Sequence, residues 1–163
     1  MGLITYKPTT PSFRKTVKID KSVLFKGRPE KNLIEELQPS SGRNNTGKIT
    51  IRHRSGGHKK KYRIINFKRN TFDKIGTVER IEYDPNRSAF IALVDYQDLK
   101  EYIIAPSDIK PGDKVISSSK TEINSGNAMK IKNIPTGTSI HNIELKPGAG
   151  GKLCRSAGSF AQV

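Results

Sequence analysis

The sequence contains no tryptophan, only one cysteine, and half as many acidic residues as basic ones. A single thiol, Cys154, excludes an internal disulfide bond and a zinc site built from cysteines. No apolar run approaches the ~20 residues that span a bilayer, and no apolar segment follows the N-terminus as it would in an exported protein. We therefore expect an intracellular protein that has no membrane partner.

Positive charge is what the sequence has in excess, with 30 Lys and Arg against 15 Asp and Glu and a net charge of +15. Residues 1–70 carry 18 basic and 4 acidic side chains, whereas residues 71–163 carry 12 and 11. Residues 43–69 hold ten basic side chains and no acid. Such a run repels itself unless a polyanion neutralises it, and it lacks the apolar stripe of a membrane-surface helix. The charge pattern therefore predicts nucleic-acid binding.

Hydrophobic residues make up only 33% of the 163 residues, but Ile, Val and Tyr recur in short clusters after residue 61. Turn sequences such as Asp84-Pro85-Asn86 separate the clusters, and an Asp followed by a Pro favours a type I turn. Short strands at this spacing predict an all-β domain over residues 61–125, most simply a five-stranded barrel. The expected strands are Tyr62–Phe67, Gly76–Tyr83, Ala89–Tyr96, Glu101–Ala105 and Lys114–Ser118.

The segment before this domain, residues 1–60, is interpreted as an extended basic arm. It contains prolines and alternating basic and apolar residues, which favour one short strand around Thr16–Ile19. Glu30–Gln38 is predicted to be a two-turn helix that ends at a proline, and residues 40–61 are expected to form an irregular basic loop.

The segment after the domain, residues 126–163, contains two strand-like runs, Ser139–Leu145 and Ser159–Val163, among many glycines. These residues are too few to enclose a core of their own, since even ~60 residues is marginal for an independent domain. We therefore expect a second barrel that is incomplete here and is finished by another polypeptide or held by a large partner.

The stretch from Arg52 to Arg63 is the most informative motif, because two adjacent glycines separate clusters of cations. Glycines let backbone amides approach phosphates closely, while Lys and Arg neutralise the phosphates and Arg or Tyr stacks on bases. The preceding Gly42–Gly47 segment offers further donors and also fits an Asx-type turn. The candidate RNA-binding residues are Arg43, Asn44, Asn45, Lys48, Arg52, His53, Arg54, Gly56, Gly57, His58, Lys59, Lys60, Lys61, Arg63, Lys68, Arg69, Arg87, Lys152 and Arg155.

Enzymatic interpretations fail on the residues they require. Gly148–Lys152 resembles a phosphate loop, but Lys146 and Leu153 stand where that motif needs Gly and Ser or Thr. Cys154 with His141 is a weak basis for a thiol nucleophile. The three histidines have no convincing carboxylate neighbours with which to form a zinc site. We expect no catalytic residue, no bound metal and no cofactor, apart from structural Mg²⁺ that belongs to the RNA.

Several segments taken together resemble one family. These segments are Gly42–Gly47, Arg52–Arg63 with its Gly-Gly-His-Lys core, Phe67–Asn70, Val78–Ala89, Asn133–Gly137, His141–Gly148 and Arg155–Gly158. From about residue 6 onward, the chain resembles the N-terminal half of the universal large-subunit ribosomal protein two family, in its bacterial or organellar form. The resemblance implies an OB-fold barrel after the arm, followed by the beginning of an SH3-like barrel.

The resemblance also implies a function. It predicts a structural constituent of the large ribosomal subunit that binds large-subunit ribosomal RNA near the peptidyl-transferase region and supports subunit association and translation. The implied partners are this RNA, other large-subunit ribosomal proteins, and a separate polypeptide that carries the C-terminal half of the family. Because 19 Ile and 20 Lys against 7 Ala suggest an AT-rich genome, a ribosome in the mitochondrial matrix is preferred and one in a bacterial cytoplasm is the alternative.

A rival hypothesis is a free OB-fold protein that binds single-stranded nucleic acid. That function requires several exposed aromatic side chains on the barrel, where bases stack. Aromatics make up only 7% of the chain, which weakens the hypothesis, but four candidates keep it open: Tyr62, Tyr83, Phe90 and Tyr96.

Overall fold

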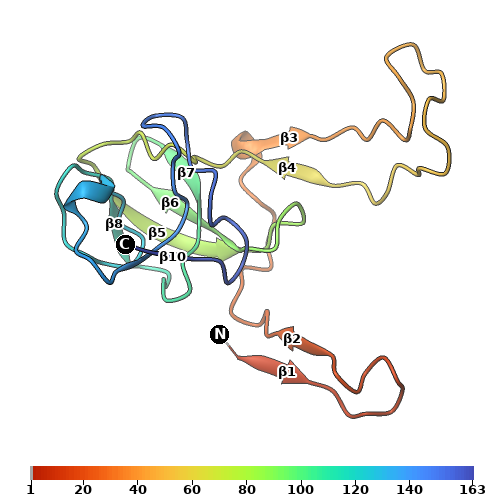
Figure 1. The fold of residues 1–163 in the computed structure, drawn as a ribbon, viewed down its shortest axis with the longest axis horizontal. Helices are drawn as coiled ribbons and strands as arrows, with labels where there is room; N and C mark the ends of the chain where they lie inside the picture. Colours follow the sequence, from red (N-terminus) through yellow and green to blue (C-terminus); the bar gives the residue numbers. More distant parts are fainter. Residues whose placement is uncertain (1) are drawn as a thin grey trace.

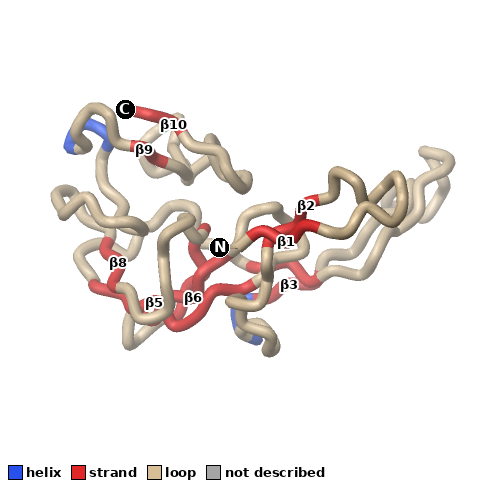
Figure 2. The backbone as a smooth tube through the Cα atoms, turned by 90° about the horizontal axis from the view of Figure 1, so that it is seen from below, coloured by secondary structure: helices blue, strands red, loops and turns tan. Residues whose placement is uncertain are grey.

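The computed structural model describes residues 2–163; Met1, the first residue of the expected arm, lies outside the described part. Its elements are short strands and two 3-10 turns, so this part of the chain is nearly all-β, as predicted. Figure 1 shows a body of strands from which two hairpins project to the same side, and the perpendicular view in Figure 2 agrees. The elements are β1 (Leu3–Thr5), β2 (Val17–Ile19), η1 (Lys31–Leu33), β3 (Ile34–Glu36), β4 (Lys61–Arg63), β5 (Ile75–Glu82), β6 (Ile91–Asp95), β7 (Lys100–Ile104), β8 (Lys114–Ile116), η2 (Ile131–Asn133), β9 (Ser139–Ile140) and β10 (Ala161–Gln162).

Four antiparallel strands form the central sheet in the order β7-β6-β5-β8. They correspond to four of the five predicted strands: β6 and β8 are shorter than predicted, and β5 and β7 each begin and end one residue earlier. Their Ile, Val, Leu and Tyr residues are the types that fit a pleated, buried surface. The register shifts between Val78 and Arg80, which marks a β-bulge in β5. A bulge bends the strand and increases its twist, which helps the sheet to curve.

A fifth segment, which follows β4, joins the two edges of this sheet. Ile65 forms a bridge to Tyr102 of β7 at one edge. At the other edge, the Asp73 N–H donates to the Ser117 carbonyl, just after β8, over 2.8 Å. The open four-stranded sheet and this segment together make the OB-fold arrangement that the resemblance implied.

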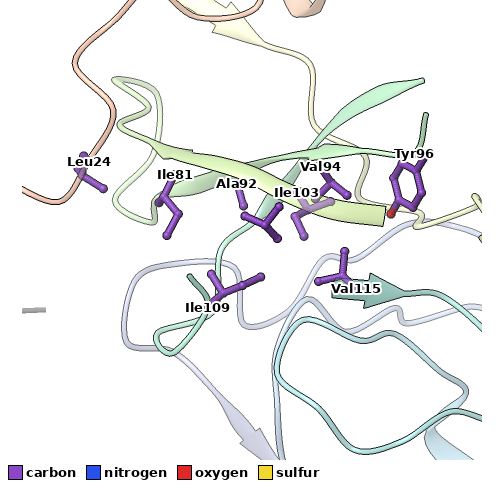
Figure 3. Close-up of a cluster of buried hydrophobic side chains, with 9 residues drawn as sticks. Leu24, Ile81, Ala92, Val94, Tyr96, Ile103, Ile109 and Val115 are labelled. Carbon is purple, nitrogen blue, oxygen red and sulfur yellow. The ribbon is translucent and has the colours of Figure 1, made fainter. Parts of the chain in front are cut away.

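The core lies on both faces of β6. Residues 91–94 of this strand have no exposed surface, because their side chains alternate between two clusters of buried residues. Burying one Val, Leu or Ile side chain contributes roughly 1.5–3 kcal/mol, so β6 is the strand that the fold depends on most. The first cluster, in Figure 3, contains Leu24, Val78, Ile81, Ala92, Val94, Tyr96, Ile103, Ile109 and Val115; the second contains Ile65, Ala89, Ile91, Leu93, Tyr102 and Ile104.

The N-terminal part of the arm is a hairpin. The strand predicted around Thr16–Ile19 is confirmed as β2, but its antiparallel partner β1 was not predicted. Leu24 is buried in the core, and the Phe25 N–H donates to the Ile81 carbonyl over 2.9 Å. These two residues attach the base of the hairpin to the barrel.

The prediction of a helix at Glu30–Gln38 is wrong. Its residues instead form the single turn η1 and then β3, which pairs antiparallel with β4. A two-turn helix is too short to be stable alone. The extended conformation packs Leu33 against the barrel and places Glu36 opposite Lys61, so tertiary contacts outweigh helix propensity here.

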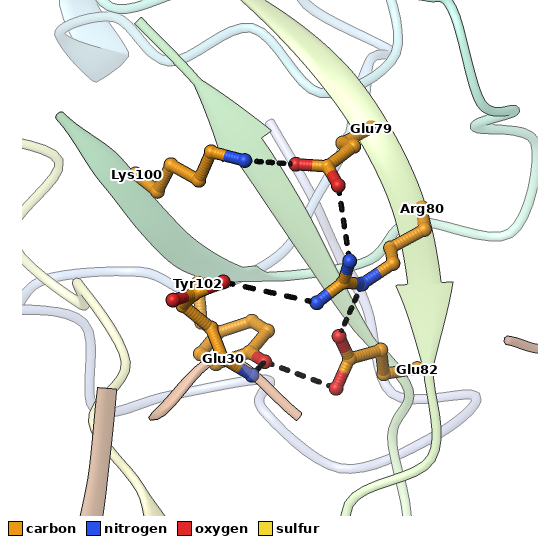
Figure 4. A network of polar contacts seen from close by, with 6 residues as sticks. All are labelled: Glu30, Glu79, Arg80, Glu82, Lys100 and Tyr102. Atoms are coloured by element: carbon orange, nitrogen blue, oxygen red, sulfur yellow. Dashed lines mark hydrogen bonds and ion pairs between the residues drawn. The ribbon is translucent and has the colours of Figure 1, made fainter. Parts of the chain in front are cut away.

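Charged side chains fasten the start of this second hairpin to the barrel (Figure 4). The buried hydroxyl of Tyr102 accepts a hydrogen bond from the Glu30 N–H at 2.9 Å and donates one to the buried Glu82 carboxylate at 3.0 Å. Arg80 Nε donates to the same carboxylate at 2.7 Å. Burial raises the pKa of Tyr102 to about 12, so its hydroxyl stays protonated and remains a donor.

Residues 126–163 contain little regular structure. The two predicted strands are confirmed only over two residues each, as β9 and β10, which pair with each other. The Gly151 N–H donates to the Phe67 carbonyl over 3.0 Å and ties this region to the barrel. Leu145 and Phe160 remain 64% and 68% exposed, as expected for the beginning of an SH3-like barrel. The domain boundaries after residues 60 and 125 stay predictions.

Candidate nucleic-acid interface

The basic loop, residues 43–61, extends from the β3–β4 hairpin away from the barrel (Figure 1). All of its residues are exposed except the half-buried Gly56. Its seven Lys and Arg side chains form no ion pair with any acid of residues 2–163. Exposed cations without internal partners are what phosphate neutralisation requires. The candidates that lie in this loop are Arg43, Asn44, Asn45, Lys48, Arg52, His53, Arg54, Gly56, Gly57, His58, Lys59, Lys60 and Lys61.

Two turns shape the start of the basic loop. Gly42 is buried with φ of +72°, and a Cβ at this position would lie 2.3 Å from the Ile51 carbonyl oxygen, so only glycine fits. The Asn44 Oδ1 accepts hydrogen bonds from the N–H groups of Thr46 at 3.1 Å and Lys48 at 2.9 Å. This confirms the Asx-type turn that the sequence suggested.

Four further candidates come from three separate segments and gather around Phe67. Lys68 follows Phe67 directly, Arg87 lies in the turn between β5 and β6, and Lys152 and Arg155 belong to the C-terminal region. They line two adjoining hollows, which we call the junction groove. The Arg155 guanidinium lies 4.0 Å from the centre of the Phe67 ring, and that of Arg87 lies 5.5 Å away. The fold thus makes one surface from residues up to 87 positions apart in the sequence.

The arginines of the junction groove are held in defined positions. Arg87 Nε pairs with the carboxylate of Asp84, which is fully buried. Arg155 Nη1 donates to the Gly151 carbonyl over 3.3 Å. A guanidinium has five N–H donors in a rigid fork, so one bond inside the protein leaves others for a phosphate. Lys68 and Lys152 are exposed and complete the positive lining of the groove.

Arg63 and Arg69 are both half-buried and line neither hollow of the junction groove. Arg63 Nη1 donates to the Lys61 carbonyl at 2.9 Å, within the same strand. Arg69 Nη2 donates to the Gly126 carbonyl at 2.9 Å, and burial lowers the pKa of its guanidinium. The structure therefore uses Arg69 to link the barrel to the following region and does not bring it to either exposed group of cations.

The glycine loop that failed the phosphate-loop motif already holds an anion of its own. The Glu144 carboxylate accepts hydrogen bonds from the N–H groups of Gly148 at 2.8 Å and Gly150 at 2.9 Å. An internal carboxylate thus occupies the backbone donors that a phosphate loop would offer to its ligand. Among residues 2–163, no group of three or more His, Cys, Asp or Glu side chains is placed to hold a metal ion, and no helix has the length and apolar character needed to cross a membrane.

Sequence reasoning named no candidate before Arg43, although residues 2–28 contain seven basic side chains and one acid. The signal was available, because an excess of basic over acidic residues, which identified the basic loop, is also present in residues 2–28. The structure places these side chains on the β1–β2 hairpin and at its base. They are Lys7, Arg14, Lys15, Lys18, Lys21, Lys26 and Arg28.

Comparison with known proteins identifies related sequences along the whole chain. The family model described as "Ribosomal Proteins L2, RNA binding N-terminal domain" matches residues 30–117, and "Ribosomal Proteins L2, C-terminal domain" matches residues 124–163. Proteins named "Large ribosomal subunit protein uL2" are 60% identical in Ruegeria sp. (strain TM1040), 57% in Gluconobacter oxydans and 55% in Parvibaculum lavamentivorans, over 99–100% of this chain. The chain spans 58–59% of the length of these relatives.

The comparisons correct two expectations. A separate polypeptide for the C-terminal half was expected, but sequence of the C-terminal domain is present in this chain itself, so that expectation is wrong. The mitochondrial matrix was the preferred setting, but the relatives are bacterial, which favours the alternative of a bacterial cytoplasm. The recognition of the family is confirmed: with both domain descriptions matched, the chain belongs to the ribosomal protein L2 family.

Proposed function

We propose that this chain is a structural constituent of the large ribosomal subunit, in a bacterial cytoplasm, and that it binds large-subunit ribosomal RNA through the basic loop and the junction groove. The name of its relatives and the RNA-binding description of the matched domain support this proposal. Following the family, we place the contact near the peptidyl-transferase region, with other large-subunit ribosomal proteins as neighbours and with support of subunit association and translation as its consequence.

The observation that carries the proposal is the unpaired charge of the basic loop. Seven exposed cations lie on a segment that projects from the barrel and has no acid of its own. On a protein that worked alone, this arrangement would be self-repelling. Against RNA it is favourable, because each neutralised phosphate releases a condensed counterion to the solvent.

The basic loop and the junction groove have different roles in the proposed RNA binding. The basic loop reaches between RNA helices and replaces their counterions, while the barrel, which is well packed, fixes the direction in which the loop projects. The junction groove adds positioned arginine donors, which suit the geometry of a phosphate. Because most of these contacts go to the backbone of the RNA, affinity depends strongly on the fold of the RNA and little on its base sequence. The proposed role is structural and assigns no catalytic step to any residue.

The rival hypothesis, a free single-strand-binding OB-fold protein, loses its support in the structure. Of the four barrel aromatics that it needs, Tyr96 is buried and Phe90 packs against the core. Tyr83 is exposed, but the ammonium group of Lys21 lies 3.9 Å from the centre of its ring. Tyr62 is half-buried. Of these four, only Tyr83 is exposed and a lysine lies over its ring, so together they present no row of free rings to a single strand.

The salt dependence of RNA binding tests the proposal. If ~8–10 phosphates are neutralised, the logarithm of the affinity for a ribosomal RNA fragment falls with the logarithm of the salt concentration at a slope of roughly −7 to −9. Replacing Lys59, Lys60 and Lys61 by Ala should flatten that slope by ~2–3.

The matched control replaces three exposed lysines near β8, Lys110, Lys114 and Lys120, by Ala and should leave the slope close to that of the unchanged protein. Equal slopes for the loop variant and the unchanged protein would remove the basic loop from the interface.

A further inference from the structure

The β1–β2 hairpin is a second projecting element, and the proposed interface leaves it without a role. It extends from the barrel on the same side as the basic loop (Figures 1 and 2). Its one acid, Asp20, accepts hydrogen bonds from the N–H and hydroxyl groups of Ser22, both at 2.8 Å, and these bonds lower the pKa of the Asp20 carboxyl. The lowered pKa keeps this carboxylate charged, but it offsets only one of the seven basic side chains of residues 2–28.

Two aromatic rings meet on this hairpin, outside the two clusters of buried residues. Tyr6 follows β1, and Phe13 lies in the loop that leads to β2. The ring centres are 5.4 Å apart and the ring planes are inclined by 43°. Each side chain remains 39% exposed, and neither belongs to a cluster of buried residues in the part that the structure describes.

A cation lies beside this aromatic pair. The Lys18 Nζ is 5.4 Å from the centre of the Tyr6 ring. Lys18 is paired with Ile4 across the hairpin, and side chains two positions apart share a face of a strand, so Ile4, Tyr6 and Lys18 lie on one face. Lys7, Arg14 and Lys15 follow in the loop, so charge surrounds the rings.

The loop that carries Phe13 is held in shape by its own hydrogen bonds. The Phe13 N–H donates to the Thr10 carbonyl at 3.0 Å, and the Thr16 hydroxyl donates to the Ser12 carbonyl at 2.6 Å. The two rings are therefore offered to solvent on a formed surface. Partly exposed rings surrounded by cations are the combination with which proteins bind single-stranded nucleic acid, where bases stack on rings and cations contact phosphates.

We propose that Tyr6 and Phe13 form a stacking platform for an unpaired base of single-stranded RNA, while the cations around them contact the phosphates on either side. A single strand fits better than a duplex, because bases inside an A-form helix keep their faces stacked on one another. RNA fits better than an acidic protein, because the flat face of an RNA base can stack on the exposed rings of the hairpin. The phosphates of RNA also match its charge, since residues 2–28 contain seven basic side chains and one acidic side chain. This inference deepens the proposed function and rests on it.

Photocrosslinking of the full chain tests the platform directly. The probe is a single-stranded oligoribonucleotide with one central 5-iodouridine, which forms bonds to an aromatic ring that stacks on it. We expect the crosslink at residue 6 or 13. Crosslinks at other residues only, with none in the hairpin, would overturn the inference.

Affinity measurements with matched variants complete the test. Replacing Tyr6 and Phe13 by Leu keeps apolar volume but removes the rings, and should weaken binding of the single-stranded probe about 10-fold, as expected for the loss of one base–aromatic stack. The slope of affinity against salt should not change, because no charge is removed. Tyr83→Leu is the control on the barrel and should bind the probe as the unchanged protein does.

The outcomes separate this inference from the proposed function. If the double variant binds the probe with unchanged affinity while the chain still binds a ribosomal RNA fragment in a salt-dependent way, the platform is wrong and the proposed function stands. If the unchanged chain binds no ribosomal RNA fragment at all, the proposed function fails. Equal loss of affinity for single-stranded and duplex probes would identify a general phosphate contact and would overturn the stacking platform.

Discussion

At the scale of single residues, the buried hydroxyl of Tyr102 shows how the arm is held on the barrel. It connects the backbone of Glu30, at the start of the second hairpin, with the buried carboxylate of Glu82 on β5. A buried carboxylate is costly unless its oxygens accept hydrogen bonds, and here Tyr102 and Arg80 supply them. The direction of the hairpin therefore depends on a few atoms inside the protein.

Replacing Tyr102 by Phe removes two hydrogen bonds without opening a large cavity. We expect the free energy of unfolding to fall by about 1–3 kcal/mol, because one Glu82 oxygen is left without its buried donor. Urea unfolding followed by circular dichroism measures the change. Tyr83→Phe is the control, because Tyr83 is 47% exposed. The Tyr83→Phe protein should be as stable as the unchanged protein. A Tyr102→Phe protein of unchanged stability would show that the network does not hold the arm.

His141 provides a pH-dependent contribution at the same scale. Burial, and to a lesser extent the positive charge of Arg69, lowers the pKa of His141 below its ordinary value of 6.5. The unfolded chain therefore binds a proton more readily than the folded chain, so stability is lost as the pH falls through about 6.5.

We expect the free energy of unfolding to decrease between pH 7 and pH 5, and to decrease less in a His141→Gln variant. His58→Gln, which changes an exposed histidine of the basic loop, should keep the full dependence. Identical pH profiles for the two variants would contradict the assignment to His141.

At the scale of elements, β5 shows how closely the strands of the barrel are packed. Gly76 lies where β5 crosses the buried side chains of Val94 and Tyr96. A Cβ at this position would lie 2.4 Å from Val94 Cγ1 and 2.6 Å from Tyr96 Cε1, which no side chain tolerates. The strand can approach the core only because it has no side chain here.

Replacing Gly76 by Ala should therefore destabilise the barrel by about 1–3 kcal/mol through overpacking. Chemical denaturation at constant pH measures the loss. The neighbouring Thr77→Ala is the control, because Thr77 is exposed on the other face of the same strand. A Gly76→Ala protein as stable as this control would show that the core yields at this point.

The second hairpin shows the limit of local patterns at this scale. Glu30–Gln38 contains good helix formers, which is why a helix was predicted, but the segment has only enough residues for two turns. Its strand partner, β4, lies some 25 residues further on, beyond the whole basic loop. The residues of the segment itself do not indicate this distant strand partner, so helix propensity alone predicted the wrong element.

At the scale of the whole molecule, the structure combines a rigid barrel with projecting elements that are poorly packed. Residues 91–94 have no exposed surface, whereas the basic loop is exposed almost throughout. Local stability follows the density of buried contacts. The barrel serves as the support, and we expect the basic loop to gain its order from the RNA proposed to neutralise it.

Amide hydrogen exchange should reveal this division. In the free protein, the amides of β6 should exchange slowest, and those of residues 52–60 should exchange almost as fast as in an unfolded chain. Addition of a ribosomal RNA fragment should slow residues 52–60 more than it slows β6. Strong protection of these residues in the absence of RNA would contradict the view that RNA orders the loop.

The sequence by itself determined the class of the fold and the distribution of charge from which we infer a polyanionic partner. An acid-free run of ten cations favours a polyanion, and short clusters of Ile, Val and Tyr between turn sequences favour strands, because both properties are local and additive along the chain. Only the tertiary structure decided which cations share a surface. Lys68, Arg87, Lys152 and Arg155 line one groove, and Arg69 turns inward to Gly126, since such distances depend on how remote segments pack.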